Sequence, residues 1–409
     1  MKTALGHIKV LDLSRVLAGP WATQNLADMG AEVIKIERPR VGDDTRTWGP
    51  PFLKDADGVE TRDSSYFLSA NRGKKSVTVD LATAEGQDII RMLVRDVDVL
   101  VENYKVGTLA RYGLAYDDLK AINPRLVYCS VTGFGQDGPY AALPGYDYVF
   151  QGMGGLMSLT GVPDGEPGGA PMKTGLAITD LLTGMYATSA ILAALEHRHI
   201  SGAGQYIDMS LLDCIVAINS YQALNYFLSG KIPQRVGNAH PNMVPYQVFH
   251  CKEGDLIIAV GNDSQYAAYC RAIGREHLAT DPMYSTGPQR NRNRATLIPL
   301  LAEAMQAKTC ANGSRCWSRK TCPAARSTTW RKCSRIRRSA IAICTCRCRT
   351  ALAWTRPASP TRSACRIRRS NTRVQRPSWA STTTPSFSSV SACRMNGWQS
   401  CGPRALFDT

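Results

Sequence analysis

The chain has 409 residues, enough for two or three domains, and its 44% hydrophobic and 20% charged residues are ordinary for a soluble globular protein. Its net charge of +16 comes from one region. Residues 310–409 contain 20 Lys and Arg but a single acid, whereas the preceding residues carry slightly more acids than bases. The charge therefore excludes a generally basic surface and separates an ordinary part of the chain from an unusual tail.

Cysteine follows the same division, since ten of the 14 cysteines lie from Cys310 onward. The other four are scattered, which fits a reducing compartment better than a disulfide framework. The first residues show no basic leader followed by an apolar core, and no stretch approaches 18 apolar residues without a charge. We therefore expect a cytoplasmic protein that does not enter a membrane.

Strand-like and helix-like patterns alternate through the first 210 residues. In chain order they predict a strand at 10–14, a break at Gly19 and Pro20, a helix at 21–29, a strand at 32–36, a helix at 84–95, and strands at 97–101 and 126–132. This alternation predicts an α/β fold with a parallel, Rossmann-like sheet. Ligands of such sheets bind at the carboxyl ends of the strands, so we expect a site near the loops after Leu13, Ile36, Val101 and Val131.

The second half predicts two long helices and then a smaller α+β domain. The helices cover 180–198, ended by Gly202, and 211–228, ended by Gly230. A strand at 256–261 and helices at 265–273 and 295–306 follow. We expect a large domain at 1–225, a small and partial domain at 226–308, and an aberrant tail at 309–409.

The tail from about Lys308 loses every helical or alternating period. A disordered basic tail that binds nucleic acid would not typically carry ten Cys and five Trp. A zinc module is equally poorly supported, because the tail has no His and no paired CxxC. A frameshift explains it better: codon degeneracy allows the same DNA, one nucleotide out of phase, to encode the acid-containing strings REWIALLESKDVPCGPINDL, ADPQVRHRDLHLPVPH and ELGEHNDAIL.

Several strings in order resemble the family III CoA-transferases, the formyl-CoA transferase or CaiB/BaiF type, over about the first 308 residues. They are VLDLSRVLAGP (10–20), GAEVIKIERP (30–39), GDDTRTWGPPF (42–52), NRGKKSVTVDL (71–81), DVLVENY (98–104), PGYDYVFQGMGGLMSLTG (144–161), TGLAITDLLTGMYA (174–187) and GAGQYIDMSLLD (202–213). The out-of-phase strings are similar to the terminal motifs of the same family. The resemblance implies a large Rossmann-like domain, a small domain and an interlinked homodimer if the reading frame is intact.

The resemblance also implies a reaction, in which CoA passes from an acyl-CoA to a free carboxylic acid through an aspartate. Asp180 matches that aspartate. Taken alone, an acid at a helix start is typically a cap or a partner of the helix dipole. The matching motif instead implies a nucleophile that forms an anhydride and then an enzyme-bound CoA thioester. This chemistry implies no metal and no permanently bound cofactor, with the coenzyme A thioester as substrate.

Further site residues follow from the resemblance. Positions that contact CoA in the family match Val16, Arg38, Lys74, Asn103 and Arg111. Without the motif, Lys74 would be interpreted as a solvated surface residue. Tyr146 matches an active-site tyrosine whose hydroxyl would stabilise an anhydride oxygen. Leu17 stands where formyl-CoA transferases carry a glutamine, which argues against formate or oxalate chemistry.

Two strings most resemble members that act on dicarboxylates such as succinate and glutarate. One contains Arg46, which would pair with the distal carboxylate of the substrate. The other contains His240, in a segment (237–247) where relatives place a mobile loop. A lone histidine is more often structural, so its substrate role is a hypothesis. The alternatives are a 2-methylacyl-CoA racemase of the same fold, which uses a His and Asp pair, and a nucleic-acid-binding protein, which would require the tail to be a selected feature.

Overall fold

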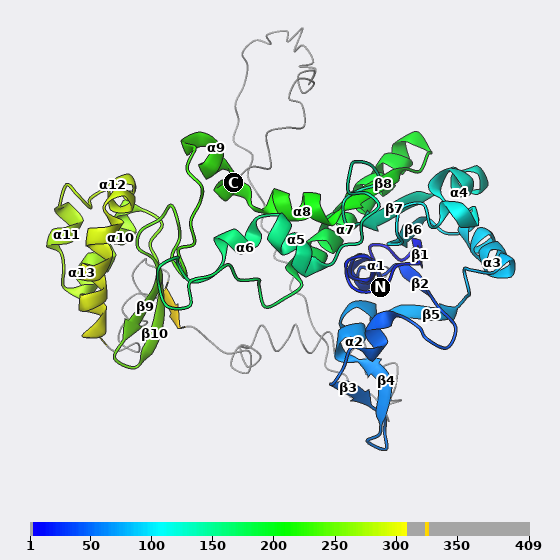
Figure 1. Cartoon of the computed structure of the whole chain (residues 1–409), viewed down its shortest axis with the longest axis horizontal. Coiled ribbons are helices and arrows are strands. Elements are labelled where there is room, and N and C mark those ends of the chain that lie inside the picture. The colour runs from blue at the N-terminus through cyan, green and yellow to red at the C-terminus, as the bar shows by residue number, and fades with distance from the viewer. Residues whose placement is uncertain (1–2, 309–323, 327–409) are drawn as a thin grey trace, which may run out of the picture. The chain divides into compact units, whose positions relative to one another are not determined.

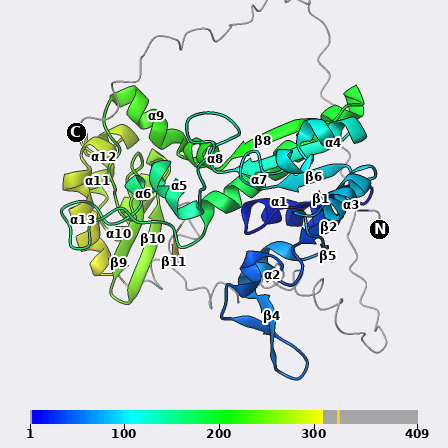
Figure 2. The same cartoon turned by 45° about the vertical axis from the view of Figure 1, so that its right-hand side comes forward.

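A computed structural model describes residues 3–308 and 324–326, and Figures 1 and 2 show its elements in two views. A six-stranded sheet holds β5 (Lys74–Thr78), β2 (Glu32–Glu37), β1 (Lys9–Asp12), β6 (Val99–Glu102), β7 (Val127–Thr132) and β8 (Tyr206–Ser210) in that order. Every neighbouring pair is parallel. The predicted Rossmann-like α/β fold is therefore confirmed.

The chain reverses its direction across the sheet between β1 and β6. From β1 it proceeds outward to β2 and β5, and it then returns to β6 and continues to β7 and β8 (Figure 1). The register pairs Leu11 with Leu100 and Asp12 with Val101, and the N–H of Leu13 continues the ladder to the carbonyl of Val101 at 2.8 Å. A ligand site is expected where two neighbouring loops diverge in this way.

Alternate residues of the strands face two apolar cores, as the period of a strand requires. Val10 packs on the face covered by α1 (Ala18–Asp28), α7 (Ile178–Ser201) and α8 (Leu211–Ile218). Leu11 packs on the opposite face with α3 (Ala84–Val94) and α4 (Tyr116–Ile122). Both faces are buried, which explains why the strands are almost continuously apolar.

Helix α1 begins earlier than the sequence predicts. We expected Gly19 and Pro20 to break the chain before a helix at 21–29, but both lie in the first turn of α1. Proline is tolerated there because the first-turn N–H groups of a helix have no intrahelical partner. Gly19 is needed for space, since a Cβ at this position would lie 2.4 Å from the Cβ of Ser14.

Helix α7 is the central helix of the large sheet, and it packs against α1, α5 (Asp147–Met153), β7 and β8. Its 24 residues are long and apolar enough to satisfy a length-and-composition criterion for a membrane span, although no such span was predicted. Ala187, Ile191 and Ala194 are buried against the sheet. A buried core helix meets the same criterion, so the finding is weak as a membrane signal.

The predicted helix at 211–228 is divided in two. Helix α8 ends at Ile218, and α9 (Ser220–Ser229) follows after Asn219. Ser220 has a φ of 46°, which interrupts a continuous helix. The Asn219 side chain donates to the carbonyl of Gly154 at 2.6 Å, at the end of α5 and before α6 (Leu156–Leu159). The break is thus fixed by a contact that no local pattern shows.

The strands β5 and β8 at the two edges of the large sheet were not predicted, nor were β9 (Tyr246–Cys251), α4, α5, α6, α11 (His277–Thr280) and α12 (Gly287–Arg292). Further short elements that were not predicted lie between strands of the large sheet along the chain. They are η1 (Asp44–Thr47), the antiparallel hairpin of β3 (Phe52–Lys54) and β4 (Glu60–Ser64), α2 (Ser65–Asn71) and η2 (Ala110–Tyr112). Ser64 caps α2 by accepting the N–H of Phe67 at 3.0 Å.

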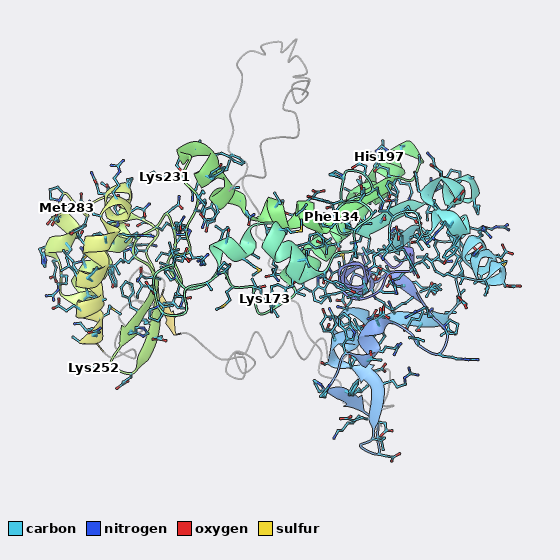
Figure 3. The ribbon with its side chains drawn as sticks, in the orientation of Figure 1. Phe134, Lys173, His197, Lys231, Lys252 and Met283 are labelled. Carbon is cyan, nitrogen blue, oxygen red and sulfur yellow. The ribbon has the colours of Figure 1, made fainter. Side chains whose placement is uncertain are left out.

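A second sheet is antiparallel and holds β11 (Ala324–Arg326), β10 (Gly254–Ala259) and β9 (Tyr246–Cys251). Lys252 lies in the turn between β9 and β10 (Figure 3). Three helices share its apolar core: α10 (Asp263–Ile273), α11 (His277–Thr280) and α13 (Arg294–Gln306). Helix α12 (Gly287–Arg292) is joined to it by Arg290, which donates to the carbonyl of Val244 at 2.8 Å. These residues form an α+β arrangement with its own core, and the predicted boundaries at 225 and 308 stay predictions.

Most of the predicted aberrant tail, 309–409, lies outside the described residues. The exception is β11, which pairs antiparallel with β10 through Ala325 opposite Ile257. The tail has no strand-like period in its sequence and we expected no regular structure beyond about Ala311, but these three residues form a strand, so for them the expectation is wrong. A three-residue edge strand requires little more than an exposed strand to pair with.

Candidate active site

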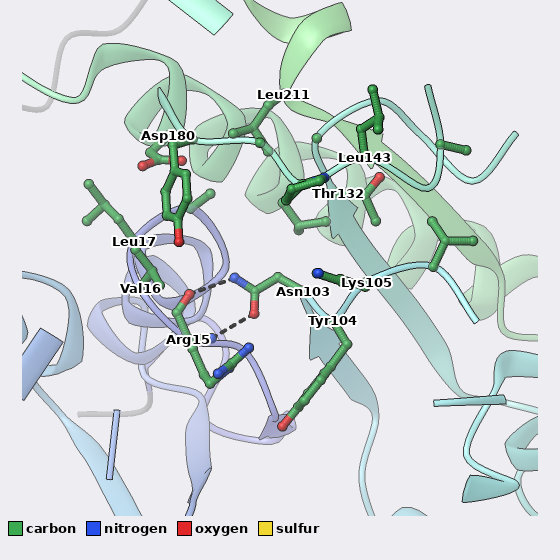
Figure 4. Close-up of a pocket in the computed structure, with 18 residues that line it drawn as sticks. Arg15, Val16, Leu17, Asn103, Tyr104, Lys105, Thr132, Leu143, Asp180 and Leu211 are labelled. Atoms are coloured by element: carbon green, nitrogen blue, oxygen red, sulfur yellow. Dashed lines mark hydrogen bonds between the residues drawn. The ribbon is translucent and has the colours of Figure 1, made fainter. Parts of the chain in front are cut away.

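A pocket of about 200 Å³ opens where the loops after β1 and β6 diverge. Its wall contains Arg15, Val16 and Leu17 from the first loop, Ala18 at the start of α1, and Asn103, Tyr104, Lys105 and Val106 from the second loop. The end of β7, the segment 141–146, Asp180 and Leu211 complete it. Figure 4 draws these residues, which lie at the sheet edge that the strand order predicts.

Asp180 reaches this pocket from the first turn of α7. The helix has no side-chain cap of its own, and Asp147 of α5 takes that role from a distance in sequence. One Asp147 carboxylate oxygen accepts the N–H of Thr179 at 2.7 Å and that of Asp180 at 3.3 Å. Burial, and then the charge of Asp147, raise the pKa of Asp180 to about 7.

Tyr146 lines the same pocket and remains 66% exposed. It is the N-cap residue of α5, so it directly precedes the Asp147 that caps α7. The two predicted catalytic residues, Asp180 and Tyr146, are therefore placed in one pocket. No histidine is among the described residues that line it. The described wall of this pocket therefore does not contain the histidine of the His and Asp pair that a racemase would use.

Asn103 and Val16, two of the predicted CoA-contacting residues, lie side by side in the pocket wall. Asn103 accepts the backbone N–H of Arg15 at 2.8 Å and donates to the carbonyl of Arg15 at 2.6 Å (Figure 4). Val16 follows with a φ of 71°, a conformation that β-branched residues rarely adopt. Backbone strain of this kind clusters at functional sites.

Comparisons with known proteins agree on one family. The family model described as CoA-transferase family III matches residues 5–377, farther along the chain than the 308 residues we expected. The chain is 54% identical over 301 residues to a protein of Agrobacterium fabrum named succinate–glutarate CoA-transferase, covering 74% of each protein. The chain belongs to CoA-transferase family III.

Further relatives support the same assignment. A human protein named succinyl-CoA:glutarate CoA-transferase is 46% identical over 302 residues, which cover 74% of this chain and 66% of that protein. The crystal structure of a CaiB/BaiF family protein from Brucella suis superposes with a TM-score of 0.72 at 45% identity, covering 83% of this chain and 88% of that one. The chain is therefore an acyl-CoA:carboxylate CoA-transferase.

In this CoA-transferase the other predicted CoA-contacting residues lie outside the pocket of Asp180. Arg38 is exposed, lines two other depressions beside β2, and pairs with Asp44 at 3.0 Å. Arg111 is exposed in η2. Both positions suit a guanidinium that meets a phosphate at the surface, and their contact with CoA stays a prediction.

Lys74 is not at the surface, so the solvated interpretation is wrong. Its side chain is 2% exposed and its ammonium donates to Asp12, to the carbonyl of Pro20 and to Asn71, each at 2.9 Å. Burial lowers the pKa of Lys74 to about 8, although the charge of Asp12 opposes this effect. An ammonium has three N–H donors, and all three are occupied by the protein itself.

Arg46 does not line the pocket of Asp180 either. Its guanidinium forms a bidentate pair with Glu37 at 2.7 Å, pairs with Asp63 and stacks over Phe67. These bonds, acting against burial, hold the pKa of Glu37 at about 2. Glu37 and Asp63 therefore already balance the positive charge of Arg46, which we predicted would pair with the distal carboxylate of a substrate.

His240 makes contacts that hold its own loop in place. Its Nδ1 accepts the N–H groups of Asn242 at 3.0 Å and Met243 at 3.1 Å, and its ring stacks on Tyr221. Burial and the nearby Arg294 lower the pKa of His240. The imidazole is therefore a neutral acceptor that shapes its own loop, and contact with substrate remains a prediction.

Sequence reasoning missed Asp147 and Asp12. Asp147 stands next to Tyr146 in the motif PGYD, and its place in the first turn of α5 was a usable signal. Asp12 is an acid inside an apolar strand, which indicates a buried partner. Within residues 3–308 and 324–326, no group of three or more His, Cys, Asp or Glu side chains is arranged to hold a metal ion.

Proposed function

We propose that Asp180 is the nucleophile of this CoA-transferase and that its acid substrates are dicarboxylates. The position of Asp180 supports its role as the nucleophile. It lies in the first turn of α7 and in the wall of the pocket between β1 and β6, where the strand order of the sheet reverses. The dicarboxylate class is supported by the names of the Agrobacterium and human relatives, both of which include succinate or succinyl-CoA and glutarate.

The proposed reaction exchanges one thioester for another. The Asp180 carboxylate attacks the acyl-CoA carbonyl and the carbon–sulfur bond breaks. CoA leaves as a thiolate, and the acyl group stays on Asp180 as a mixed anhydride. The thiolate then attacks the aspartyl carbonyl, which releases the donor acid as a carboxylate and leaves Asp180 as a CoA thioester. The acceptor carboxylate attacks that thioester, and the released thiolate attacks the acyl carbonyl of the second anhydride. Asp180 is regenerated and a new acyl-CoA departs, with no net oxidation.

The electrostatics of Asp180 suit this role. A carboxylate that is poorly solvated and lies near a second negative charge is more basic than an ordinary aspartate, and its pKa is raised to about 7. Near neutral pH it is still substantially ionised, which nucleophilic attack requires.

Tyr146 is proposed to stabilise the charge that develops on the carbonyl oxygen during each attack. Its hydroxyl is the donor type that the step needs, and the residue lines the same pocket as Asp180. Arg46 is already paired with internal carboxylates, so another cation must receive the distal carboxylate. Arg15 and Lys105 are the basic residues in the pocket wall, and because Arg15 already pairs with Asp44 at 3.2 Å, we propose Lys105 for this contact.

Substitution of Asp180 tests the nucleophile. Asp180→Ala should reduce CoA transfer to background, while Asp213→Ala, which removes another acid from a helix first turn, should retain activity within about threefold. Asp180→Asn should be inactive when fresh, although amides deamidate slowly. Full transfer by the alanine variant would contradict the mechanism.

A substrate panel tests the acid class separately. We expect succinyl-CoA to donate to glutarate or a similar diacid far better than formyl-CoA donates to oxalate. The absence of the glutamine at Leu17 supports this expectation. Preference for formyl-CoA would contradict the dicarboxylate assignment and leave the role of Asp180 untouched.

We also propose that the enzyme acts as a homodimer. Its helix α9 and the following segment expose a run of large apolar side chains: Leu224, Phe227, Leu228 and Ile232 are between 57% and 86% exposed. Contiguous exposed apolar surface of this kind marks a protein interface. The dimer is expected where the reading frame is intact, so light scattering on the frame-corrected chain should give twice the monomer mass. A monomer at micromolar concentration in that chain would contradict this proposal.

A further inference from the structure

Val16 carries strain at the edge of the active-site pocket. Its φ of 71° puts a β-branched residue in the left-handed region, where Cβ lies too close to the following carbonyl oxygen. Such a conformation persists only when the surroundings impose it. The residues around the turn at 14–16 show how it is imposed.

Side chains hold almost every backbone polar group of this turn. The N–H and hydroxyl of Ser14 donate to one Asp12 oxygen at 3.0 and 2.5 Å, and the Ser14 carbonyl accepts from Lys35 at 2.8 Å. The N–H of Val16 donates to Asp43 at 3.4 Å. Asn103 makes two more bonds with the backbone of Arg15, which Figure 4 shows. Together these contacts leave the turn little freedom.

Three of the side chains that make these contacts are charged, namely Asp12, Lys35 and Asp43, and a fourth charge, Lys74, pairs with Asp12; all four are buried. Lys74 pairs with Asp12 at 2.9 Å, with side chains 2% and 0% exposed, and Lys35 pairs with Asp43 at 3.0 Å, with side chains 1% and 0% exposed. Buried ion pairs add little net stability, because the loss of hydration offsets their attraction. Stability is therefore a poor reason for placing two such pairs beneath one turn.

We propose that Asp12, Lys35, Asp43 and Lys74 form a positioning cluster that fixes the strained turn at 14–16 and thereby the wall of the pocket that faces the reacting groups. Lys74 serves the reaction through Asp12 and Ser14, and its ammonium does not contact the CoA phosphates. The occupied donors of Lys74 support this, since a phosphate would have to displace Asp12, Pro20 or Asn71. Only the kinetic consequence of the proposal rests on the proposed function.

Amide hydrogen exchange on the full chain tests the positioning without any measurement of activity. Lys74→Met alone leaves Asp12 as an unpaired buried charge, so the main variant is Asp12→Asn with Lys74→Met, which removes both charges at nearly constant volume. Residues 13–18 should exchange about tenfold faster in this variant, while residues 9–11 of β1 keep their protection. The matched control is Lys75→Met, because Lys75 is the neighbouring lysine and is 70% exposed.

Kinetics separate positioning from direct CoA binding. The double variant should lose kcat by about a hundredfold with KM changed less than threefold, since a small displacement near reacting groups has this effect. Lys75→Met should match the unmodified chain in both constants. The single variant Lys74→Arg should also have a low kcat although it keeps the positive charge, because a guanidinium cannot reproduce the three 2.9 Å bonds of the ammonium.

Two results would overturn the proposal. One is unchanged exchange at residues 13–18 in a folded double variant. The other is a rise confined to KM, which is the signature of a lost contact with the CoA thioester. Failure of Asp180→Ala to abolish transfer would overturn the proposed nucleophile and leave the exchange result standing.

Discussion

The carboxylate of Asp147 accepts the backbone N–H of Asp180 at 3.3 Å, and also that of Thr179 at 2.7 Å. The same carboxylate receives a bond from the Gln151 side chain at 2.6 Å. One acid thus caps the helix that presents Asp180, fixes its position and places a negative charge beside it. The contact that positions the proposed nucleophile therefore also adds to the rise in its pKa, after the larger effect of burial.

Asp147→Asn should shift the pH dependence of CoA transfer. The pKa of Asp180 is raised to about 7, mainly by burial and then by Asp147, and the reaction needs the ionised form. Activity should therefore rise with pH through about 7 in the unmodified enzyme. Removing the charge of Asp147 while keeping an acceptor oxygen should lower the midpoint of kcat/KM by roughly one pH unit.

Asp117→Asn provides the control for that measurement, because Asp117 is an exposed acid in the first turn of α4. Its pH profile should match that of the unmodified enzyme. An unmoved midpoint in Asp147→Asn would show that Asp147 does not tune the acid group that limits the reaction.

Glu102→Gln should change how stability depends on pH. Burial raises the pKa of Glu102 from 4.5 to about 7, against the hydrogen bonds from Ser130 and the N–H of Tyr104. Between these two values the unfolded chain loses the proton and the folded chain retains it. The free energy of unfolding should therefore fall as pH rises from about 4.5 to 7, by roughly 2–3 kcal/mol from this group.

Urea unfolding at pH 5 and pH 8 measures this effect. The unmodified chain should lose stability relative to Glu102→Gln between the two pH values. Glu253 is an exposed acid in the turn between β9 and β10, and it provides the control. The free energy of unfolding of Glu253→Gln should match that of the unmodified chain at both pH values. Parallel stability curves for the unmodified chain and Glu102→Gln would contradict the raised pKa.

Gly184→Ala should destabilise the large sheet domain. A Cβ at Gly184 would lie 2.7 Å from the carbonyl oxygen of Ala18 and 2.9 Å from the ring of Trp21, where α7 crosses α1. The backbones would have to separate, at a cost of about 1–3 kcal/mol. The helical Gly152 is the control: its Cβ would meet only Met157 at 3.7 Å, so Gly152→Ala should be neutral. Equal melting temperatures of the two variants would argue against the close crossing.

The gene provides a test of the tail. If residues after about Lys308 are encoded out of phase, sequencing across the codons for Lys308 to Ala311 should reveal a single-nucleotide shift. The adjacent frame should then continue with the strings that contain VPCGPIN, ADPQV and LGEHN. A clean reading frame in independent clones, with no such continuation, would contradict the frameshift.

The alternating pattern was sufficient to predict the parallel sheet and the edge that carries the pocket. Val10 and Leu11 face opposite cores, so both faces of the strands are apolar, which is the signature of a covered parallel sheet. The motifs also indicated Asp180, Tyr146, Val16 and Asn103, which the structure gathers in one pocket.

The residues that the sequence could not place are those whose partners are distant along the chain. Lys74 looks like a surface lysine until Asp12, 62 positions away, is brought beneath it by the pairing of β1, β2 and β5. Arg46 looks available until Glu37 and Asp63 surround it. Spacing in one sequence reports faces and turns, but a charge is neutralised by tertiary neighbours that no local period reveals.

A mass measurement on the peptide that contains Asp180 tests the central claim most directly. Incubated with succinyl-CoA and no acceptor, the enzyme should hold CoA on Asp180 as a thioester, and hydroxylamine should convert that residue to a hydroxamate. Asp180→Ala should give neither product, and Asp213→Ala should give both. An adduct on a different residue, or transfer without any adduct under conditions that trap thioesters, would contradict the account.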